Sequence, residues 1–174
     1  MKLNFVTLLL AAVSLSSAVG QAVSPVQSQN LFTVLSCNDG DTCKLQASNS
    51  TVLKVRLVGI DAPEFKHSKK GETQPIAAES KEFINKLIVG KSVTLRKIGT
   101  DIYKRELGEI FVGDTNVNIA MIKAGFAEKY QGRLPSEVDA QAYSDAEDLA
   151  KKEKKGIWSL QNYESPKTYR KRIK

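Results

Sequence analysis

The 174-residue sequence contains very little histidine and cysteine. His67 is the only histidine, and Cys37 and Cys43 are the only two cysteines, so the chain lacks the ligands for a His/Cys zinc site. Long hydrophobic runs are scarce as well. The one near the start, Phe5–Val13, is too short to span a bilayer comfortably, and no later segment could do so. Internal repeats are also lacking, which excludes a solenoid.

The first residues have the pattern of an export signal. Met1-Lys2 is a short basic start, an apolar run follows, and small and serine residues continue to Ala22. We therefore interpret residues 1–22 as a secretory signal peptide, with a transmembrane anchor as the alternative, and residues 23–30 as a flexible lead-in. We expect an exported protein, secreted or periplasmic, with no membrane anchor after the signal is removed.

Positive charge is in excess. Lysine and arginine number 26 against 19 aspartates and glutamates, so the formal net charge is +7. A basic exported domain attracts polyanions such as nucleic acid, anionic lipid or acidic polysaccharide. Charge alone does not choose among them, and it can also serve solubility alone.

Hydrophobic periodicity and turn residues predict the elements of one domain over residues 31–160. The predicted strands are 31–35, 42–45, 51–60, 92–98 and 107–112, and the predicted helices are 75–89, 117–127 and 136–154. Five short strands with a helix between the third and fourth are typical of an OB-fold. We therefore predict an α+β, mainly β fold, a five-stranded OB-fold barrel with three helices. Residues 161–174 form a basic tail, and we expect its end, Lys167–Lys174, to be frayed.

The two cysteines flank Asn-Asp-Gly-Asp-Thr, a strong hairpin-turn signal. If the turn centres on Gly40, Cys37 and Cys43 face each other across the hairpin. Export to oxidising conditions favours a disulfide, and two small buried side chains are the alternative.

Carboxylates gather where the predicted strands end. Asp39 and Asp41 lie in the first hairpin, and Asp61 and Glu64 flank Pro63 at the end of the third strand. Two aspartates from neighbouring strands can hold a hard divalent cation, and Ca²⁺ prefers such carboxylate and carbonyl shells. A third carboxylate nearby can orient or deprotonate a water.

Two arginines accompany these carboxylates. Arg56 lies on the third strand, and Arg105 lies at the turn between the fourth and fifth strands, with Tyr103 beside it. Guanidinium groups pair with phosphate oxygens and stabilise the charge that develops on them. The inventory therefore suits metal-assisted phosphodiester hydrolysis. The basic loop 66–73 we interpret as solvated rather than as a substrate contact.

Several sequence blocks, in one order from about Phe32 to Trp158, closely resemble the staphylococcal nuclease family. They are NDGDT (38–42), RLVGIDAPE (56–64), KHSKKG (66–71), DIYKRELG (101–108), VNIAMIKAGFA (117–127) and AKKEKKGIW (150–158). The resemblance implies an OB-fold barrel with three helices that hydrolyses DNA and RNA with Ca²⁺ and leaves 3′-phosphate ends. We expect a monomer.

The resemblance also implies a role for individual residues. Asp41 and Asp61 match the calcium-binding carboxylates. Ala62 stands where the nuclease has a threonine whose backbone carbonyl contacts the metal, and alanine keeps that carbonyl. Glu64 matches the catalytic glutamate, the general base or water-orienting group. The phosphate-binding arginines are matched by Arg56 and Arg105.

The substrate-binding positions match less closely. Tyr103 matches a tyrosine near the 5′-phosphate of a bound nucleotide. Ile102 stands where the nuclease has a phosphate-contacting lysine. Gln131 and Arg133 stand where it has two tyrosines, and Tyr130, one residue away, can substitute for one of them. We therefore expect altered substrate binding with the chemistry retained.

A non-catalytic nucleic-acid-binding module on the same barrel is the main alternative, and a barrel for anionic polysaccharide or lipid is a weaker one. Binding alone needs no general base. The presence of all three carboxylates and both arginines therefore favours the nuclease.

Overall fold

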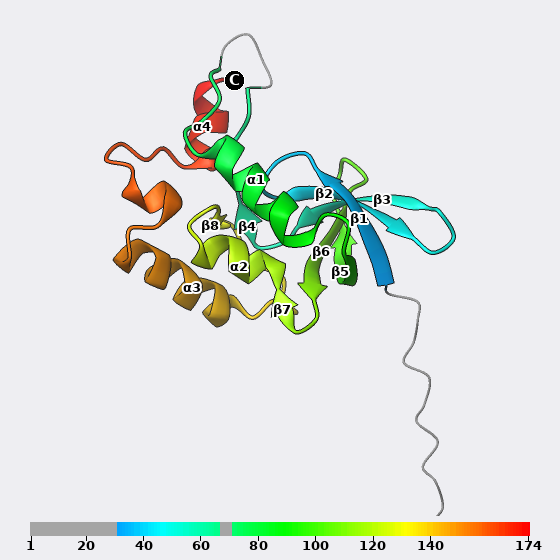
Figure 1. Ribbon diagram of the computed structural model, residues 1–174. Helices are drawn as coiled ribbons and strands as arrows, with labels where there is room; N and C mark the ends of the chain where they lie inside the picture. Colours follow the sequence, from blue (N-terminus) through cyan, green and yellow to red (C-terminus); the bar gives the residue numbers. More distant parts are fainter. Residues whose placement is uncertain (1–30, 67–70) are drawn as a thin grey trace, which may run out of the picture.

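A computed structural model describes residues 31–66 and 71–174 (Figure 1). The predicted signal peptide (1–22), the predicted lead-in (23–30) and the centre of the basic loop (67–70, with His67) lie outside the described residues. In the part of the chain that is described, no helix combines the length and the apolar character needed to cross a membrane.

Short strands outnumber helices among the described residues. The strands are β1 (Leu31–Cys37), β2 (Thr42–Ala47), β3 (Val52–Leu57), β4 (Ile60–Asp61), β5 (Ser92–Thr100), β6 (Glu106–Val112), β7 (Thr115–Asn116) and β8 (Glu128–Lys129). The helices are α1 (Ala77–Ile88), α2 (Val117–Lys123), α3 (Ala140–Lys152) and α4 (Pro166–Arg172), and a 3₁₀ helix spans Gly156–Ser159.

Five of the strands close into a mixed barrel. The sheet order is β3-β2-β1-β5-β6-β7, and a parallel pairing of β3 with β6 joins the two sides. Alternating apolar side chains fill the interior, among them Val34, Leu45, Val55, Leu57, Leu95 and Ile110. The predicted OB-like, mainly β fold is confirmed.

The predicted third strand, 51–60, is interrupted. β3 ends at Leu57, and β4 begins at Ile60 and pairs with β8 rather than with the barrel. Gly59 lies between them with a φ of 80°, a conformation that favours glycine. A Cβ at Gly59 would also lie 2.7 Å from the Tyr143 ring. The interruption turns Asp61 away from the barrel sheet.

The three predicted helices are present with shorter bounds, and a fourth was not predicted. α4 forms within the predicted basic tail, so the expectation of a frayed end was wrong. Ser165 caps α4 by accepting from the Thr168 N–H at 3.1 Å, and Pro166 occupies the first turn, where it needs no N–H partner. In Figure 1, α4 (red) lies beside the segment that follows β4.

Candidate active site

A cleft of about 840 Å³ opens at one end of the barrel. It is lined by the β1–β2 loop, the β3–β4 turn with the segment after it, the β5–β6 loop, and α4. The acidic side chains in its lining are Asp39, Asp41 and Glu64. The cations in its lining are Lys54, Arg56, Lys81, Arg105, Arg133, Arg170 and Lys174. This combination suits an anionic ligand bound beside a cation.

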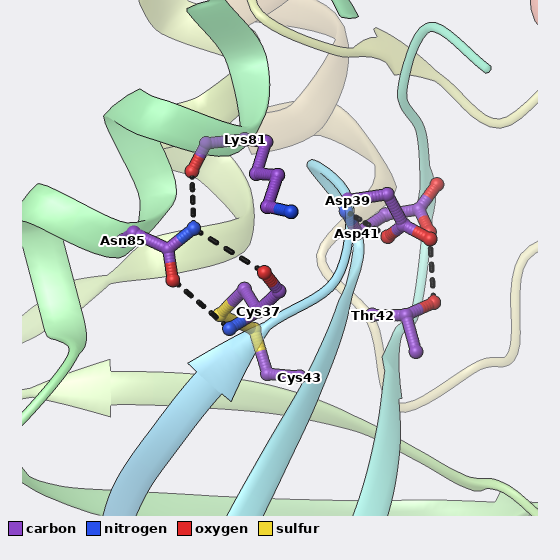
Figure 2. Close-up of a disulfide and its surroundings, with 7 residues drawn as sticks. All are labelled: Cys37, Asp39, Asp41, Thr42, Cys43, Lys81 and Asn85. Carbon is purple, nitrogen blue, oxygen red and sulfur yellow. Dashed lines mark hydrogen bonds between the residues drawn. A yellow bond between two sulfur atoms is a disulfide. The ribbon is translucent and has the colours of Figure 1, made fainter. Parts of the chain in front are cut away.

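Cys37 and Cys43 face each other across the hairpin, as the turn pattern predicted, and of the two alternatives left open by the sequence they form a disulfide that closes the base of the β1–β2 loop (Figure 2). Asn85 of α1 adds a second constraint. Its Oδ1 accepts from the Cys37 N–H at 3.0 Å, and its Nδ2 donates to the Cys37 carbonyl at 3.3 Å. Asp39 and Asp41 lie on the loop just beyond this clamp (Figure 2). Their backbone is therefore held from both sides.

Gly40 allows this loop to approach its neighbours closely. A Cβ at this position would lie 2.7 Å from the Ala62 Cβ and 2.0 Å from the Ser80 Oγ. The Ser80 hydroxyl is buried and donates to the Phe126 carbonyl at 2.7 Å, so it cannot easily move aside. The missing side chain thus lets Asp41 reach the backbone after β4.

Asp41 and Asp61 converge on Arg56. They are only 3% and 1% exposed. Arg56 Nη1 forms an ion pair with Asp41 Oδ1, and Arg56 Nη2 donates to Asp61 Oδ1 at 3.0 Å. The Ala62 N–H donates to Asp41 Oδ2 at 3.0 Å, and the Thr42 hydroxyl donates to Asp41 Oδ1 at 3.1 Å. The predicted metal residues Asp41, Asp61 and Ala62 therefore lie together.

Burial and mutual charge set the protonation of this cluster. Burial, together with the charge of Asp41, raises the pKa of Asp39 to about 7. Burial works against the charge of the Arg56 guanidinium, but Asp41 and Asp61 outweigh it and raise the pKa of Arg56 above its usual range. Arg56 therefore stays charged.

Glu64 is positioned through its backbone. Its N–H donates to Gln74 Oε1 at 3.0 Å, and the Gln74 N–H donates to the Glu64 carbonyl at 2.9 Å. Gln74 is buried, and its Nε2 donates to the Glu164 carbonyl at 2.8 Å. The Glu64 carboxylate accepts from Arg170 Nη1 at 2.5 Å. The segment that leads into α4 and α4 itself thus both contact the Glu64 region.

Arg105 also lines the cleft, and its Nη1 donates to the Thr42 hydroxyl at 3.5 Å. Its Nε and Nη2 both lie 2.7 Å from Asp101 Oδ2, and Asp101 Oδ1 accepts from the Arg105 N–H at 2.9 Å. The guanidinium carbon lies 5.6 Å from the centre of the Tyr103 ring. That ring is 74% exposed, so one face is available to a ligand.

Tyr130, Gln131 and Arg133, which the resemblance places near the substrate, do not all line the same pocket. Tyr130 and Arg133 line the cleft and are exposed. Gln131 does not: its Nε2 donates to Glu128 Oε1 at 2.9 Å, in a separate pocket of about 600 Å³ between β8, α3 and the C-terminal segment. Of these three residues, Tyr130 is therefore the aromatic one that lines the cleft.

The oxygen donors near Asp41 fit a calcium-type site. Two carboxylates and the backbone of Ala62 meet there, and Ca²⁺ completes such shells with carbonyls and waters. Among residues 31–66 and 71–174, no three His, Cys, Asp or Glu side chains are grouped as metal ligands. The two carboxylates fit an ion whose shell is completed by waters and carbonyl oxygens, and the Ala62 backbone lies beside them through its N–H contact with Asp41.

Sequence reasoning missed Arg170. Its guanidinium donates from Nη1 to Asp61 Oδ1 at 2.9 Å and from Nη2 to Asp61 Oδ2 at 2.7 Å, across 109 positions of sequence. Ser165-Pro166, a cap followed by a first-turn proline, was a usable signal for the helix. No local pattern indicated where that helix docks.

Residues 54–160 match the family described as Staphylococcal nuclease homologue. Curated relatives named "Probable endonuclease LCL3" occur in several fungi. The one from Eremothecium gossypii is 35% identical over 70% of this chain and 46% of its own length. The relative from Komagataella phaffii is 31% identical over 75% of this chain and 60% of its own length. The relative from Saccharomyces cerevisiae is 33% identical over 72% of this chain and 48% of its own length.

The chain spans about half the length of these curated relatives, from 46% to 60%. The family match covers more than half of the chain and includes Arg56 on β3, Asp61 on β4 and Arg105 in the β5–β6 loop. The chain belongs to the staphylococcal nuclease homologue family.

Proposed function

We propose that this chain is a metal-dependent endonuclease that hydrolyses phosphodiester bonds of DNA and RNA. We further propose that Ca²⁺ is its cation and that cleavage leaves 3′-phosphate ends. The observation that carries the proposal is the convergence of Asp41 and Asp61 beneath a cleft lined with cations. The family is generally metal-dependent, and the similar fungal proteins are named as probable endonucleases.

Asp41, Asp61 and the Ala62 carbonyl would hold the cation. Bound there, it supplies positive charge beside the scissile phosphate. Arg56 and Arg105 would bind the phosphate oxygens, since both line the cleft and each carries a planar set of donors. Asp41 and Asp61 hold the terminal nitrogens of Arg56, and Asp101 holds Nε and Nη2 of Arg105, so a bound phosphate would have to replace these carboxylates as the acceptor.

Glu64 takes the role of general base or water-orienting group. Its backbone is clamped by Gln74, so its carboxylate is presented to the cleft at a fixed place. A positioned base that accepts the proton of the attacking water contributes about 10²- to 10⁴-fold to the rate.

Tyr103 and Tyr130 would bind the nucleotide on either side of this centre. Both rings are exposed at the cleft. Stacking of a base on an aromatic ring contributes about 1–3 kcal/mol. Ile102 is exposed where the resemblance implies a phosphate-binding lysine, and its apolar side chain cannot contact a phosphate as a lysine would.

We also propose that the mature protein is exported, to the periplasm or the medium, and acts as a monomer. The apolar start of the sequence and the Cys37–Cys43 disulfide support export, because disulfides persist in oxidising compartments. Sequencing the N-terminus of the protein recovered outside the cytoplasm would test the signal.

Digestion of single-stranded DNA by the mature protein, with Ca²⁺ and with a chelator, tests the function. We expect cleavage only with Ca²⁺, 3′-phosphate ends on the fragments, and a loss of about 10²-fold or more in Glu64→Gln. Unchanged cleavage by Glu64→Gln would remove Glu64 from the mechanism. DNA binding without cleavage under any divalent cation would favour the non-catalytic binding module.

A further inference from the structure

The helix α4 is a folded part of the site region. Pro166 and Tyr169 are buried, and the Tyr169 hydroxyl donates to the Glu72 carbonyl at 2.6 Å. The same hydroxyl packs against Gly71, where a Cβ would lie only 2.5 Å from it. Tyr169 therefore fixes α4 beside the segment that carries Glu64.

The next residue, Arg170, reaches into the acidic cluster. Its two terminal nitrogens contact both oxygens of Asp61, at 2.9 and 2.7 Å, and Nη1 also contacts Glu64 Oε1 at 2.5 Å. A guanidinium fork on both oxygens of a carboxylate is a strong, geometrically specific pairing. One side chain thus bridges a predicted metal ligand and the predicted general base.

This pairing conflicts with a cation on the same carboxylate. Asp61 is 1% exposed and already accepts from Arg56 at 3.0 Å, so Arg170 uses much of its remaining acceptor capacity. Arg56 and Arg170 already place two positive groups on this buried carboxylate, so a divalent cation added beside them would be repelled strongly, because little water screens it. A divalent cation that binds Asp61 has to displace the Arg170 fork.

We propose that Arg170 is a positioning residue that holds Asp61 and Glu64 together and occupies the place of the divalent cation until that cation displaces it. This inference rests on the cation site of the proposed function. Arg170 of the C-terminal helix then competes with the metal for Asp61. The affinity for the cation would thus depend partly on a residue outside the matched family region, 54–160.

Displacement does not require α4 to undock. The contacts of Tyr169 and the hydrogen bond from Gln74 to the Glu164 carbonyl are independent of the Arg170 side chain. That side chain is 37% exposed and lines the cleft, so it can swing toward solvent. Once it leaves, the Glu64 carboxylate loses that ion pair.

Calcium titration calorimetry of the full mature chain and its variants tests this competition. We expect Arg170→Gln to bind Ca²⁺ about tenfold more tightly than the unsubstituted protein, since a charge-assisted pairing no longer has to be broken. Arg170→Lys keeps the charge without the fork, so its affinity should lie between the two.

Arg172→Gln is the matched control. Arg172 lies on the same helix and pairs with the Glu164 carboxylate through a similar fork, at 2.8 Å for both nitrogens, but it does not line the cleft. Its Ca²⁺ affinity should stay within about twofold of the unsubstituted value. Circular dichroism of each variant verifies that the fold is kept.

Equal or weaker Ca²⁺ binding by Arg170→Gln would overturn the competition while leaving the proposed nuclease intact. Absence of Ca²⁺ binding in every variant would overturn both, because the cation site itself would be wrong. Tighter binding in both Arg170→Gln and Arg172→Gln would also overturn it, since a general loss of positive charge would then explain the change.

Discussion

Asp61 and Glu109 are both 1% exposed, but their surroundings differ. Asp61 accepts from two arginines, Arg56 and Arg170, that line the cleft. Glu109 lies on β6 away from the cleft, where the Tyr143 hydroxyl and Asn116 Nδ2 each donate to Oε1 at 2.8 Å and Arg96 pairs with Oε2.

The comparison separates two uses of a buried carboxylate. The neutral donors on Glu109 belong to Asn116, which caps α2, and to Tyr143 of α3, so this carboxylate joins the barrel to two helices. The partners of Asp61 are long charged side chains that a cation or a phosphate can displace. We infer that Glu109 serves stability, whereas the Asp61 cluster serves binding and chemistry.

The largest effect is expected from Arg105→Lys in the cleft. A lysine is a point charge and cannot reproduce the fork, so cleavage should fall by about 10²- to 10³-fold, or about 3–4 kcal/mol. Single-turnover cleavage of DNA measures the rate, and urea unfolding should show little change. Near-normal turnover would remove Arg105 from the mechanism.

Glu109→Ala should show the reverse pattern. It removes the nearer acceptor of the Tyr143 hydroxyl, leaving only the Val58 carbonyl at 3.4 Å, and it opens a buried space, so the free energy of unfolding should fall by about 2–3 kcal/mol. Below the melting transition, the cleavage rate should stay within about twofold. The control is Glu106→Ala, which removes a more exposed pair with Lys97 and should cost less than about 1 kcal/mol. A large loss of cleavage by folded Glu109→Ala would end the distinction between the two clusters.

Removal of the disulfide is expected to affect both stability and cation binding, unlike the two substitutions above. The bridge closes a short loop, with a sequence separation of 6, so replacing both Cys37 and Cys43 by alanine should cost about 2 kcal/mol of unfolding free energy. Because the loop carries Asp41, Ca²⁺ affinity should weaken as well. Urea unfolding and calorimetry of the double variant test both effects. Unchanged affinity would mean that Asn85 and Gly40 position the loop without the bridge.

The smallest effect concerns Glu128, in the second pocket. Burial, aided by the charges of Asp61 and Glu147, raises the pKa of Glu128 to about 7 although the Tyr163 hydroxyl donates to it. The folded state therefore favours the protonated acid. This contribution to stability is full below about pH 4.5, the unfolded value, and is lost as the pH rises through about 7.

Glu128→Gln mimics the protonated form at every pH. The stability of the unsubstituted protein relative to Glu128→Gln should drop by about 1 kcal/mol between pH 4.5 and pH 8. Urea unfolding at the two values measures it, with the exposed Glu137→Gln as control. A difference that does not change with pH would show that folding does not raise the pKa of Glu128.

Local patterns in the sequence predicted much of the site. Asp41, Asp61 and Glu64 lie at or next to the ends of strands, and a closed barrel brings such ends together. The start of α3 was predicted less well. The expected helix began at residue 136, but Asp139, three residues later, is the residue that caps it. Asp139 accepts from the N–H groups of Gln141 and Ala142, so the helix begins at Ala140.

The strand alternation, the turn chemistry around Gly40 and the set of carboxylates and arginines can be predicted from the chain alone, since these depend on neighbours a few positions apart. The contact between Arg170 and Asp61 arises only from the tertiary fold. Their contact spans 109 positions and depends on Tyr169 docking against Gly71 and Glu72. A seven-residue helix carries little information about its partner, because its docking energy comes from packing and not from its own propensity.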